Sequence, residues 1–167
     1  MLERLITQVG EHPKLELWQP PLCGDIDIRI DREGQWHCQG TPFNRDRMVR
    51  LFASVLRREQ DGDYYLVTPV EKWRLQVDDL PFVLTQLHSD DHGSTLSGPL
   101  GIECKVNSDH PWQLIDGIPA VRLWHGNWAR LSRPLYYQLA DKALSRGNEL
   151  GIELAGQWCV LGLQDAC

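Results

Sequence analysis

The sequence lacks an apolar run long enough to cross a bilayer, for which about 18 or more residues are needed. Its first stretch, MLERLITQVGEH, contains Glu3 and has no continuous apolar segment, so a secretory signal peptide is not expected. We therefore predict a cytoplasmic protein without a membrane span. The rest of the composition, 42% apolar and 24% charged residues in a chain of 167, is typical of one globular domain or of two small ones.

The sequence also lacks paired cysteines. Its cysteines are odd in number and no two form a C-x-x-C pair; they are Cys23, Cys38, Cys104, Cys159 and Cys167. The central three lie in strand-like apolar surroundings, where a thiol acts as a small hydrophobic group. Neither a zinc ribbon nor a disulfide framework is expected.

An excess of positive charge is missing as well. The formal net charge is −6, which argues against a long nucleic acid as partner, because proteins that bind one carry a basic face. A single nucleotide held by a local arginine remains compatible with this charge. The G-x-S-x-G, Walker A, G-x-G-x-x-G and H-E-x-x-H motifs are all absent, and we predict no cofactor.

The patterns that are present predict an α+β fold. Apolar residues at helical spacing predict helices at residues 2–9, 45–59 and 132–146. Alternating or short apolar runs bounded by turn residues predict strands at 25–31, 35–39, 64–68, 73–77, 82–87, 101–106, 112–115 and 120–124, and a closing hairpin at 151–163.

The second half of the chain repeats the order of elements of the first. Shifting the helix at 45–59 by 88 positions superposes Leu51 on Leu139 and Leu56 on Leu144. We interpret this as a duplicated strand-strand-helix-strand unit, giving two small packed domains. The expected division is an N-terminal helix and linker at 1–19, a first α+β domain at 20–93 and a second at 94–167.

The stretch GDIDIRID, Gly24 to Asp31, alternates strictly between isoleucine and charged residues. Such alternation predicts a strand with the isoleucines facing the core, because unpaired ionised carboxylates are costly to bury. The polar face then meets water or a second domain. If the second domain covers it, Arg29 should bridge Asp27 or Asp31; if it meets water, Arg29 should contribute little to stability. An EF-hand is not expected, since its central glycine and closing glutamate are missing.

The run from Cys23 to Phe82 resembles an uncharacterised bacterial family, domain of unknown function 1285. The resemblance rests on CGDIDIRIDREGQWHCQGTP, RLFASVLRRE and DGDYYLVTPVEKWRLQVDDLPF, of which YYLVTPVEK is the most specific part. The C-terminal half matches more loosely, through VRLWHGNWARLSRPLYYQLA and GQWCVLG.

This resemblance implies a domain duplication whose second unit is superficially similar to a pleckstrin-homology domain. It also implies a ligand site in the groove between the domains, and signal-linked binding of a small nucleotide-like ligand. No enzymatic activity comes with it.

Six residues are candidates for contacting such a ligand. Glu71 and Lys72 form an acid–base pair next to a turn, and Lys72 could bind a phosphate or carboxylate. Arg122 lies within an apolar strand, where a buried guanidinium needs an acceptor and suits an anion. The full set of candidates is Arg29, Glu71, Lys72, Arg122, Arg133 and Tyr137. His88 and His92, in HSDDH, are expected in a hairpin turn that binds no metal.

Three functions remain open from the sequence. The first is a non-catalytic module that binds a small nucleotide-like or anionic ligand between the two domains and takes part in signal transduction. The second is a hydrolase-like enzyme that uses Asp27 or Glu71 as a general base. The third is a protein–protein scaffold that exposes Trp18, Trp124 and Trp128.

Overall fold

The computed structural model describes residues 14–164. The helix predicted at 2–9 lies outside these residues. The chain divides into two compact units: unit 1 comprises residues 1–81 and 124–127, and unit 2 comprises 82–123 and 128–167. The division at Pro81 and Phe82 lies earlier in the chain than the boundary expected at 93/94, because the strand that begins at Phe82 pairs with residues 129–131.

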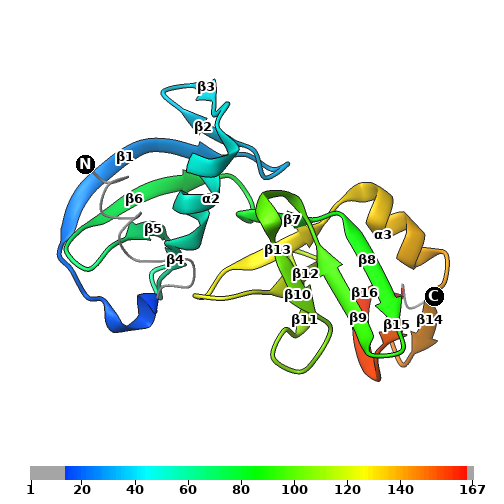
Figure 1. Cartoon of the computed structure of the whole chain (residues 1–167). Coiled ribbons are helices and arrows are strands. Elements are labelled where there is room, and N and C mark those ends of the chain that lie inside the picture. The colour runs from blue at the N-terminus through cyan, green and yellow to red at the C-terminus, as the bar shows by residue number, and fades with distance from the viewer. Residues whose placement is uncertain (1–13, 165–167) are drawn as a thin grey trace. The chain divides into compact units, whose positions relative to one another are not determined.

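Unit 1 is built on one six-stranded sheet in the order β3-β2-β1-β6-β5-β4 (Figure 1). Its β1 and β6 run parallel, and its other neighbouring strands are antiparallel. The elements are η1 (Leu15–Leu17), β1 (Leu22–Ile30), β2 (Trp36–Cys38), β3 (Thr41–Pro42), α2 (Asp46–Ser54), β4 (Leu56–Arg58), β5 (Tyr64–Val67) and β6 (Lys72–Val77).

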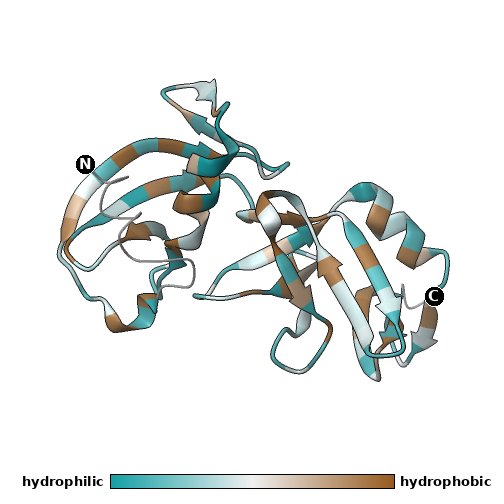
Figure 2. Cartoon of the chain, in the orientation of Figure 1, coloured by the Kyte–Doolittle hydropathy of each residue, from teal (hydrophilic) through white to brown (hydrophobic). Residues whose placement is uncertain are grey.

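The core of unit 1 forms where α2 packs on the sheet. Phe52 of α2 stacks on Trp36 of β2, with ring centroids 6.5 Å apart, and meets Phe43 edge-on. Ile30 and Leu66 are fully buried. Alternating hydropathy along β1 is visible in Figure 2 and matches the predicted strand.

The helix predicted at 45–59 is shorter than expected. It ends at Ser54, and Leu56–Arg58 form β4 instead. Val55 is fully buried and leaves helical geometry with a φ of −115°. The tertiary pairing of β4 with β5 therefore overrides the local helical pattern.

Unit 2 contains three small sheets, in the orders β10-β9-β8, β11-β12-β13-β7 and β14-β15-β16. The elements are β7 (Phe82–Leu84), β8 (Gln86–Asp90), β9 (Gly93–Ser97), η2 (Pro99–Gly101), β10 (Glu103–Lys105), β11 (Trp112–Ile115), β12 (Ile118–Arg122), β13 (Trp128–Leu131), α3 (Arg133–Ala140), β14 (Leu144–Arg146), β15 (Glu149–Leu154) and β16 (Gln157–Leu163). The hairpins predicted at HSDDH and at the C-terminal end are present as β8–β9 and β15–β16.

The helix predicted at 132–146 also ends early, at Ala140, and is followed by β14. Ser132 caps it as expected, since its side chain accepts a hydrogen bond from the N–H of Leu135. Each long helix thus precedes a three-stranded antiparallel meander, β4-β5-β6 or β14-β15-β16. The α+β class is confirmed, while the duplication and the pleckstrin-homology-like character stay predictions.

Two of the cysteines expected in apolar surroundings, Cys104 and Cys159, are buried. Burial raises the pKa of the Cys104 thiol to about 11 and that of Cys159 to about 12. Both thiols are therefore protonated at neutral pH and act as core side chains. Within residues 14–164, no helix combines the length and hydropathy that a bilayer crossing requires.

Candidate ligand-binding site

The candidate residues named from the sequence are divided between the two units. In unit 1, Arg29 lies on β1, Glu71 directly precedes β6 and Lys72 begins it. In unit 2, Arg122 ends β12, while Arg133 and Tyr137 lie on α3. Both α3 residues are exposed.

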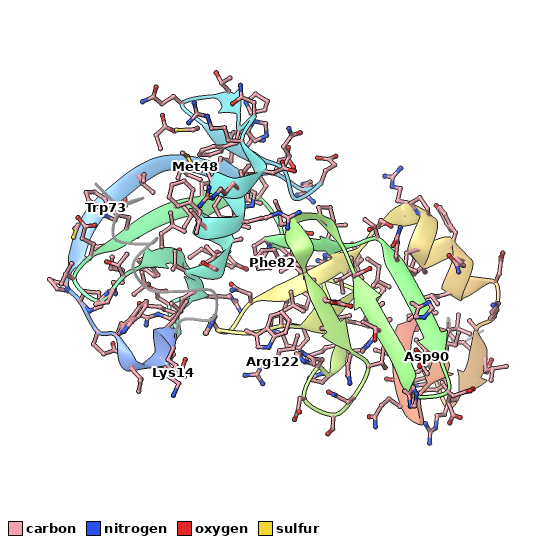
Figure 3. All side chains as sticks on the ribbon, viewed as in Figure 1. Lys14, Met48, Trp73, Phe82, Asp90 and Arg122 are labelled. Carbon is pink, nitrogen blue, oxygen red and sulfur yellow. The ribbon has the colours of Figure 1, made fainter. Side chains whose placement is uncertain are left out.

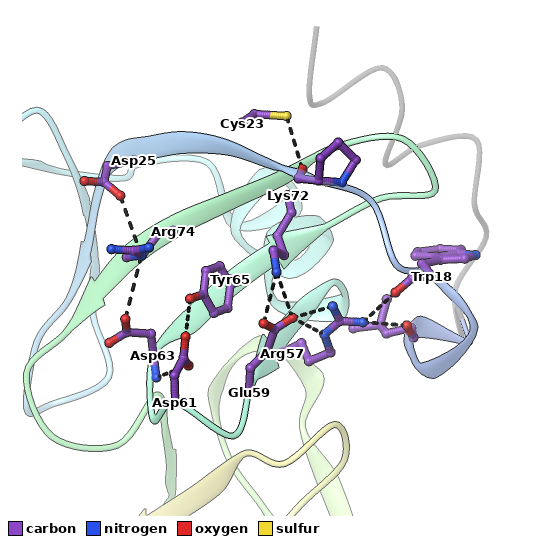
Figure 4. A network of polar contacts seen from close by, with 12 residues as sticks. Trp18, Cys23, Asp25, Arg57, Glu59, Asp61, Asp63, Tyr65, Lys72 and Arg74 are labelled. Atoms are coloured by element: carbon purple, nitrogen blue, oxygen red, sulfur yellow. Dashed lines mark hydrogen bonds and ion pairs between the residues drawn. The ribbon is translucent and has the colours of Figure 1, made fainter.

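Lys72 is paired with Glu59 rather than with its neighbour Glu71. Its Nζ lies 3.0 Å from Oε1 of Glu59 and 4.6 Å from the ring centroid of Tyr65 (Figure 4). Partial burial would raise the pKa of Glu59, but hydrogen bonds from Arg57 and Lys72 together hold it below its ordinary value. An added anion would therefore have to compete with Glu59 for this lysine.

Glu71 closes a tight turn after β5. Its backbone N–H donates to Oγ1 of Thr68 over 3.0 Å, and its carbonyl accepts from the N–H of Thr68 over 2.9 Å. The Oε2 atom of Glu71 is buried and has no hydrogen-bond partner among the described residues. The turn predicted at TPVEK is present, but its acid and base do not form the pair that the sequence suggested.

The buried arginine expected at Arg122 is found at Arg130 instead. Arg122 is exposed, and Figure 3 shows its side chain projecting from the protein. Arg130, on the neighbouring β13, is buried, and its Nη1 donates to the carbonyl oxygens of Ile118 and Ile115 over 2.8 and 3.1 Å. In the sheet, Arg122 is opposite Trp128, and Arg130 is opposite Ala120. The apolar residues around Arg122 in the sequence did not indicate which of the two arginines faces the core.

The faces of β1 are those that the alternation predicted. Ile28 and Ile30 are buried, with 3% and 0% of their surface exposed, and Ile26 is partly buried. Asp27 and Arg29 are exposed. The assignment of the isoleucine face to the core is therefore confirmed for the second half of the strand.

The partner of Arg29 differs from the one expected. Its Nε donates to Oδ2 of Asp78 over 2.9 Å, not to Asp27 or Asp31. Asp78 follows β6, two residues beyond Gln76, which is opposite Arg29; this diagonal position is within reach of a long arginine side chain. The bond from Arg29 lowers the pKa of Asp78. Asp31 instead lies 2.8 Å from Nε2 of His37.

A pocket of about 510 Å³ lies in unit 1 where β1 and β6 change register. Asp25 pairs with Arg74, and Arg29 pairs with Gln76. Three residues of β1 therefore lie opposite the single residue Leu75 of β6. Bulges of this kind are common next to binding sites, because they interrupt pairing and redirect side chains.

Residues from both faces of β1 and β6 line this pocket, which places the opening between the two strands. Its apolar lining includes Ile26, Ile28, Leu75 and Val77. Its polar lining consists of Asp25, Asp27, Arg29, His37, Asp63, Tyr64, Arg74 and Gln76, together with Gly40 and Gly62. A concave, half-apolar space of this size with a few polar groups is typical of small-molecule sites.

Arg74 is the central cation of the pocket. Its Nε lies 3.7 Å from a carboxylate oxygen of Asp25 and 3.7 Å from one of Asp63. Dashed lines in Figure 4 mark both ion pairs. Both distances are too long for a hydrogen bond. The same Nε is buried and has no hydrogen-bond partner among residues 14–164. The side chain as a whole is 41% exposed, so the other guanidinium donors can reach an acceptor on a ligand.

Arg74 and Gln76 were not among the residues predicted from the sequence, although one pattern indicates them. The strand WRLQV alternates polar and apolar residues as β1 does, so its polar face could have been aligned with that of β1. The register shift that opens the pocket has no signature in the sequence. In the part of the chain that the structure describes, no three His, Cys, Asp or Glu side chains are grouped as metal ligands.

The fold and the pocket define an α+β protein built on a mixed sheet, with a polar opening between two parallel strands. The profile of the family described as "Domain of unknown function (DUF1285), N-terminal domain" matches residues 13–80. A solved structure of a DUF1285 family protein from Silicibacter pomeroyi DSS-3 is 32% identical to this chain, with a TM-score of 0.84. The match covers 98% of this chain and 95% of the other. The chain belongs to the DUF1285 family.

A second solved DUF1285 family protein, from Shewanella baltica OS155, is 29% identical, with a TM-score of 0.58. That match covers 70% of this chain and 92% of the other. The comparison with curated proteins found no match. Family membership therefore supports the fold and leaves the function to be argued from the site.

Proposed function

We propose that this chain is a non-catalytic binding module for a small nucleotide-like ligand, held in the pocket between β1 and β6 of unit 1. The expectation from the sequence was a nucleotide-like or anionic ligand in the groove between the two domains, with a role in signal transduction. The pocket supports the small-molecule part of that expectation, since its volume lies within the range of roughly 300–1,000 Å³ common to ligand sites.

The observation that carries this proposal is the interrupted pairing of β1 with β6. No ladder pair joins Ile26, Asp27 or Ile28 to β6. Strand backbone groups are costly to leave without partners away from water. An opening at this point, lined by the partly exposed guanidinium of Arg74, offers hydrogen bonds that a ligand could complete.

The chemistry of the lining supports binding over hydrolysis. Of the two general bases considered from the sequence, Asp27 lines the pocket and Glu71 does not. A catalytic carboxylate is usually oriented by a second group that shares or relays its proton. Among the described residues no side chain is hydrogen-bonded to the Asp27 carboxylate, so Asp27 is suited to contacting a ligand.

The test is a thermal-shift screen of the full chain against nucleosides, nucleotides, cyclic dinucleotides and small inorganic anions. A ligand present at 100 times its Kd should add about 2.7 kcal/mol to the free energy of unfolding. The same screen is run on Gln76→Trp, which places a large ring on an exposed position of β6 that lines the pocket. Gln86→Trp, at an exposed position of β8 in unit 2, is the matched control.

The proposal expects a ligand that stabilises the wild-type chain and Gln86→Trp equally but not Gln76→Trp. A ligand that binds Gln76→Trp as well as wild type would place the site elsewhere. Turnover of that ligand by the wild-type chain, lost in Asp27→Asn, would favour the hydrolase instead.

A further inference from the structure

The charges around the pocket select among nucleotide-like ligands. Resting on the function proposed above, we infer that the group recognised here is an uncharged, amino-bearing heterocycle, as in adenosine or cytidine, and that phosphate is disfavoured. The inference depends on the pocket's charge balance, on one free carboxylate and on the apolar walls.

The surroundings of the pocket are net negative. Asp25, Asp27 and Asp63 line it. Its two guanidinium groups, Arg29 and Arg74, are already neutralised by nearby carboxylates. Among the lining residues, three carboxylates therefore stand against two guanidinium groups. A phosphate entering this space would be repelled, since like charges in a partly desolvated site are unfavourable.

Asp27 supplies a free acceptor. It lies in the bulged part of β1, and only its backbone carbonyl is engaged, by the N–H of Gln39 over 3.2 Å. Within residues 14–164 its carboxylate has no ion-pair or hydrogen-bond partner. An ionised carboxylate only accepts hydrogen bonds, so the matching ligand group is a donor such as an exocyclic amino group.

Arg74 supplies the complementary donor. Its side chain is 41% exposed in the pocket lining, so its terminal N–H groups can donate to a ring nitrogen that lies next to an amino group. Ile26 and Val77, which line the pocket and are partly exposed, offer apolar surface to the faces of a flat ring. One donor, one acceptor and apolar walls together match the edge and faces of an aminopyrimidine or aminopurine.

The experiment measures Kd by isothermal titration calorimetry on the full chain with matched pairs of probes. Adenosine is compared with inosine, and cytidine with uridine, because each pair replaces an amino group and its acceptor nitrogen by a carbonyl and an N–H. Each amino nucleoside is also compared with its 5′-monophosphate and 5′-triphosphate. We expect the amino nucleoside to bind at least about tenfold tighter than its partner, which is 1.4 kcal/mol. Each phosphate group should weaken binding further, and added salt should reduce that loss.

Asp27→Asn distinguishes the role of the carboxylate. The variant should weaken amino nucleoside binding about tenfold, or 1.4 kcal/mol, and should reduce the penalty for phosphate. Asp109→Asn, an exposed aspartate of unit 2, is the matched control and should change neither.

Each outcome bears on the inference separately from the function. Tighter binding of a monophosphate than of its nucleoside, abolished by Gln76→Trp, overturns the inference and leaves the proposed function standing. Equal binding of adenosine and inosine also overturns it. If neither amino nucleoside binds at millimolar concentration, the inference is wrong whatever ligand the wider screen finds.

Discussion

Among residues 14–164, Arg57 and Arg130 are the buried arginines, and each donates to backbone carbonyl oxygens. Arg57, on β4, donates from Nη1 to the carbonyls of Leu15 and Trp18 over 2.8 and 2.9 Å, and its Nε donates to Glu59. These bonds attach η1 and the chain that follows it to the sheet (Figure 4). A guanidinium group suits this role because its donors point in several fixed directions and it stays charged.

Replacing Arg57 by methionine tests that attachment. Arg57→Met keeps the apolar stem but leaves two carbonyls and part of the Glu59 carboxylate without donors. We expect a loss of about 3 kcal/mol in the free energy of unfolding, the lower end for breaking a buried ion pair. The lower end applies because Glu59 retains Lys72.

Urea unfolding followed by tryptophan fluorescence measures this loss. Arg58→Met, at the exposed next position, is the control and should stay within about 0.5 kcal/mol of wild type. An equal effect of the two substitutions would show that the bonds of Arg57 contribute nothing specific.

His125 makes the stability of unit 1 depend on pH. Burial lowers its pKa, and Arg57 adds to that effect, while Glu16, with Oε2 3.8 Å from Nδ1, opposes it. The unfolded chain therefore binds this proton more readily than the folded one. The stability that depends on neutral His125 is present above its ordinary pKa of about 6.5 and is lost as the pH falls below that value.

His125→Asn should flatten that pH dependence. Asparagine tolerates the left-handed backbone of this position, where φ is 59°. Urea unfolding of both proteins at a series of pH values around 6.5 gives the two slopes. The wild-type chain should lose stability more steeply on acidification than His125→Asn, and parallel curves would exclude a contribution from His125.

At the scale of the element, β1 combines an isoleucine face that packs in the core with a charged face that supplies most of its residues in the pocket lining. Ile28→Ala should lower the free energy of unfolding by about 2–5 kcal/mol, because Ile28 is 3% exposed and packs in the core. Arg29→Ala should cost at most about 1 kcal/mol, since its ion pair with Asp78 is exposed to solvent. Urea unfolding of the two variants measures both losses of stability. A smaller loss for Ile28→Ala than for Arg29→Ala would show that the two faces of β1 are assigned the wrong way round.

Much of this element could be predicted from the sequence, for a physical reason. Side chains alternate across a strand, so charged and apolar residues at period two determine which face is buried. The same reasoning located the hairpins at Asp90–Gly93 and Leu154–Gln157. It did not locate β4, because Leu56 and Arg57 continue a helical pattern and only their pairing with β5 makes them a strand.

The pocket could not be predicted from the sequence, although most of its lining residues could be placed on strands. It depends on the register between β1 and β6, which run parallel although they are far apart in the chain. A change of register depends on three-dimensional packing and leaves the alternation within each strand intact. The six candidates chosen from the sequence therefore included Arg29 but not Arg74, whose importance comes from its position opposite Asp25.

At the scale of the whole molecule, unit 1 is assembled from two stretches of chain. Its main part, up to Pro81, includes the segment that matches the N-terminal domain of the family, residues 13–80. Its second part, Trp124–Asn127, covers β4, the last strand of the sheet. The N–H of Arg58 donates to the carbonyl of His125 over 3.1 Å, and Nδ2 of Asn127 donates to the carbonyl of Leu56 over 2.9 Å.

The short second part should therefore contribute to the stability of unit 1. Asn127 is 2% exposed, and its removal leaves the buried Leu56 carbonyl without this donor. We expect Asn127→Ala to lower the free energy of unfolding by about 1–3 kcal/mol, the usual cost of an unsatisfied buried group. The cost should lie in the lower part of that range, because Oδ1 of Asn127 is itself buried without a partner among the described residues, and its removal is favourable.

Urea unfolding of the full chain measures that loss, and amide hydrogen exchange locates it. Asn44→Ala, at an exposed position before α2, is the control and should leave the stability within about 0.5 kcal/mol of wild type. Exchange should accelerate at the amides of β4 and β5 in Asn127→Ala, because β4 is an edge strand of the sheet and loses one of the bonds that cover it. Unchanged exchange at β4 together with unchanged stability would mean that residues 124–127 lie against unit 1 without stabilising it.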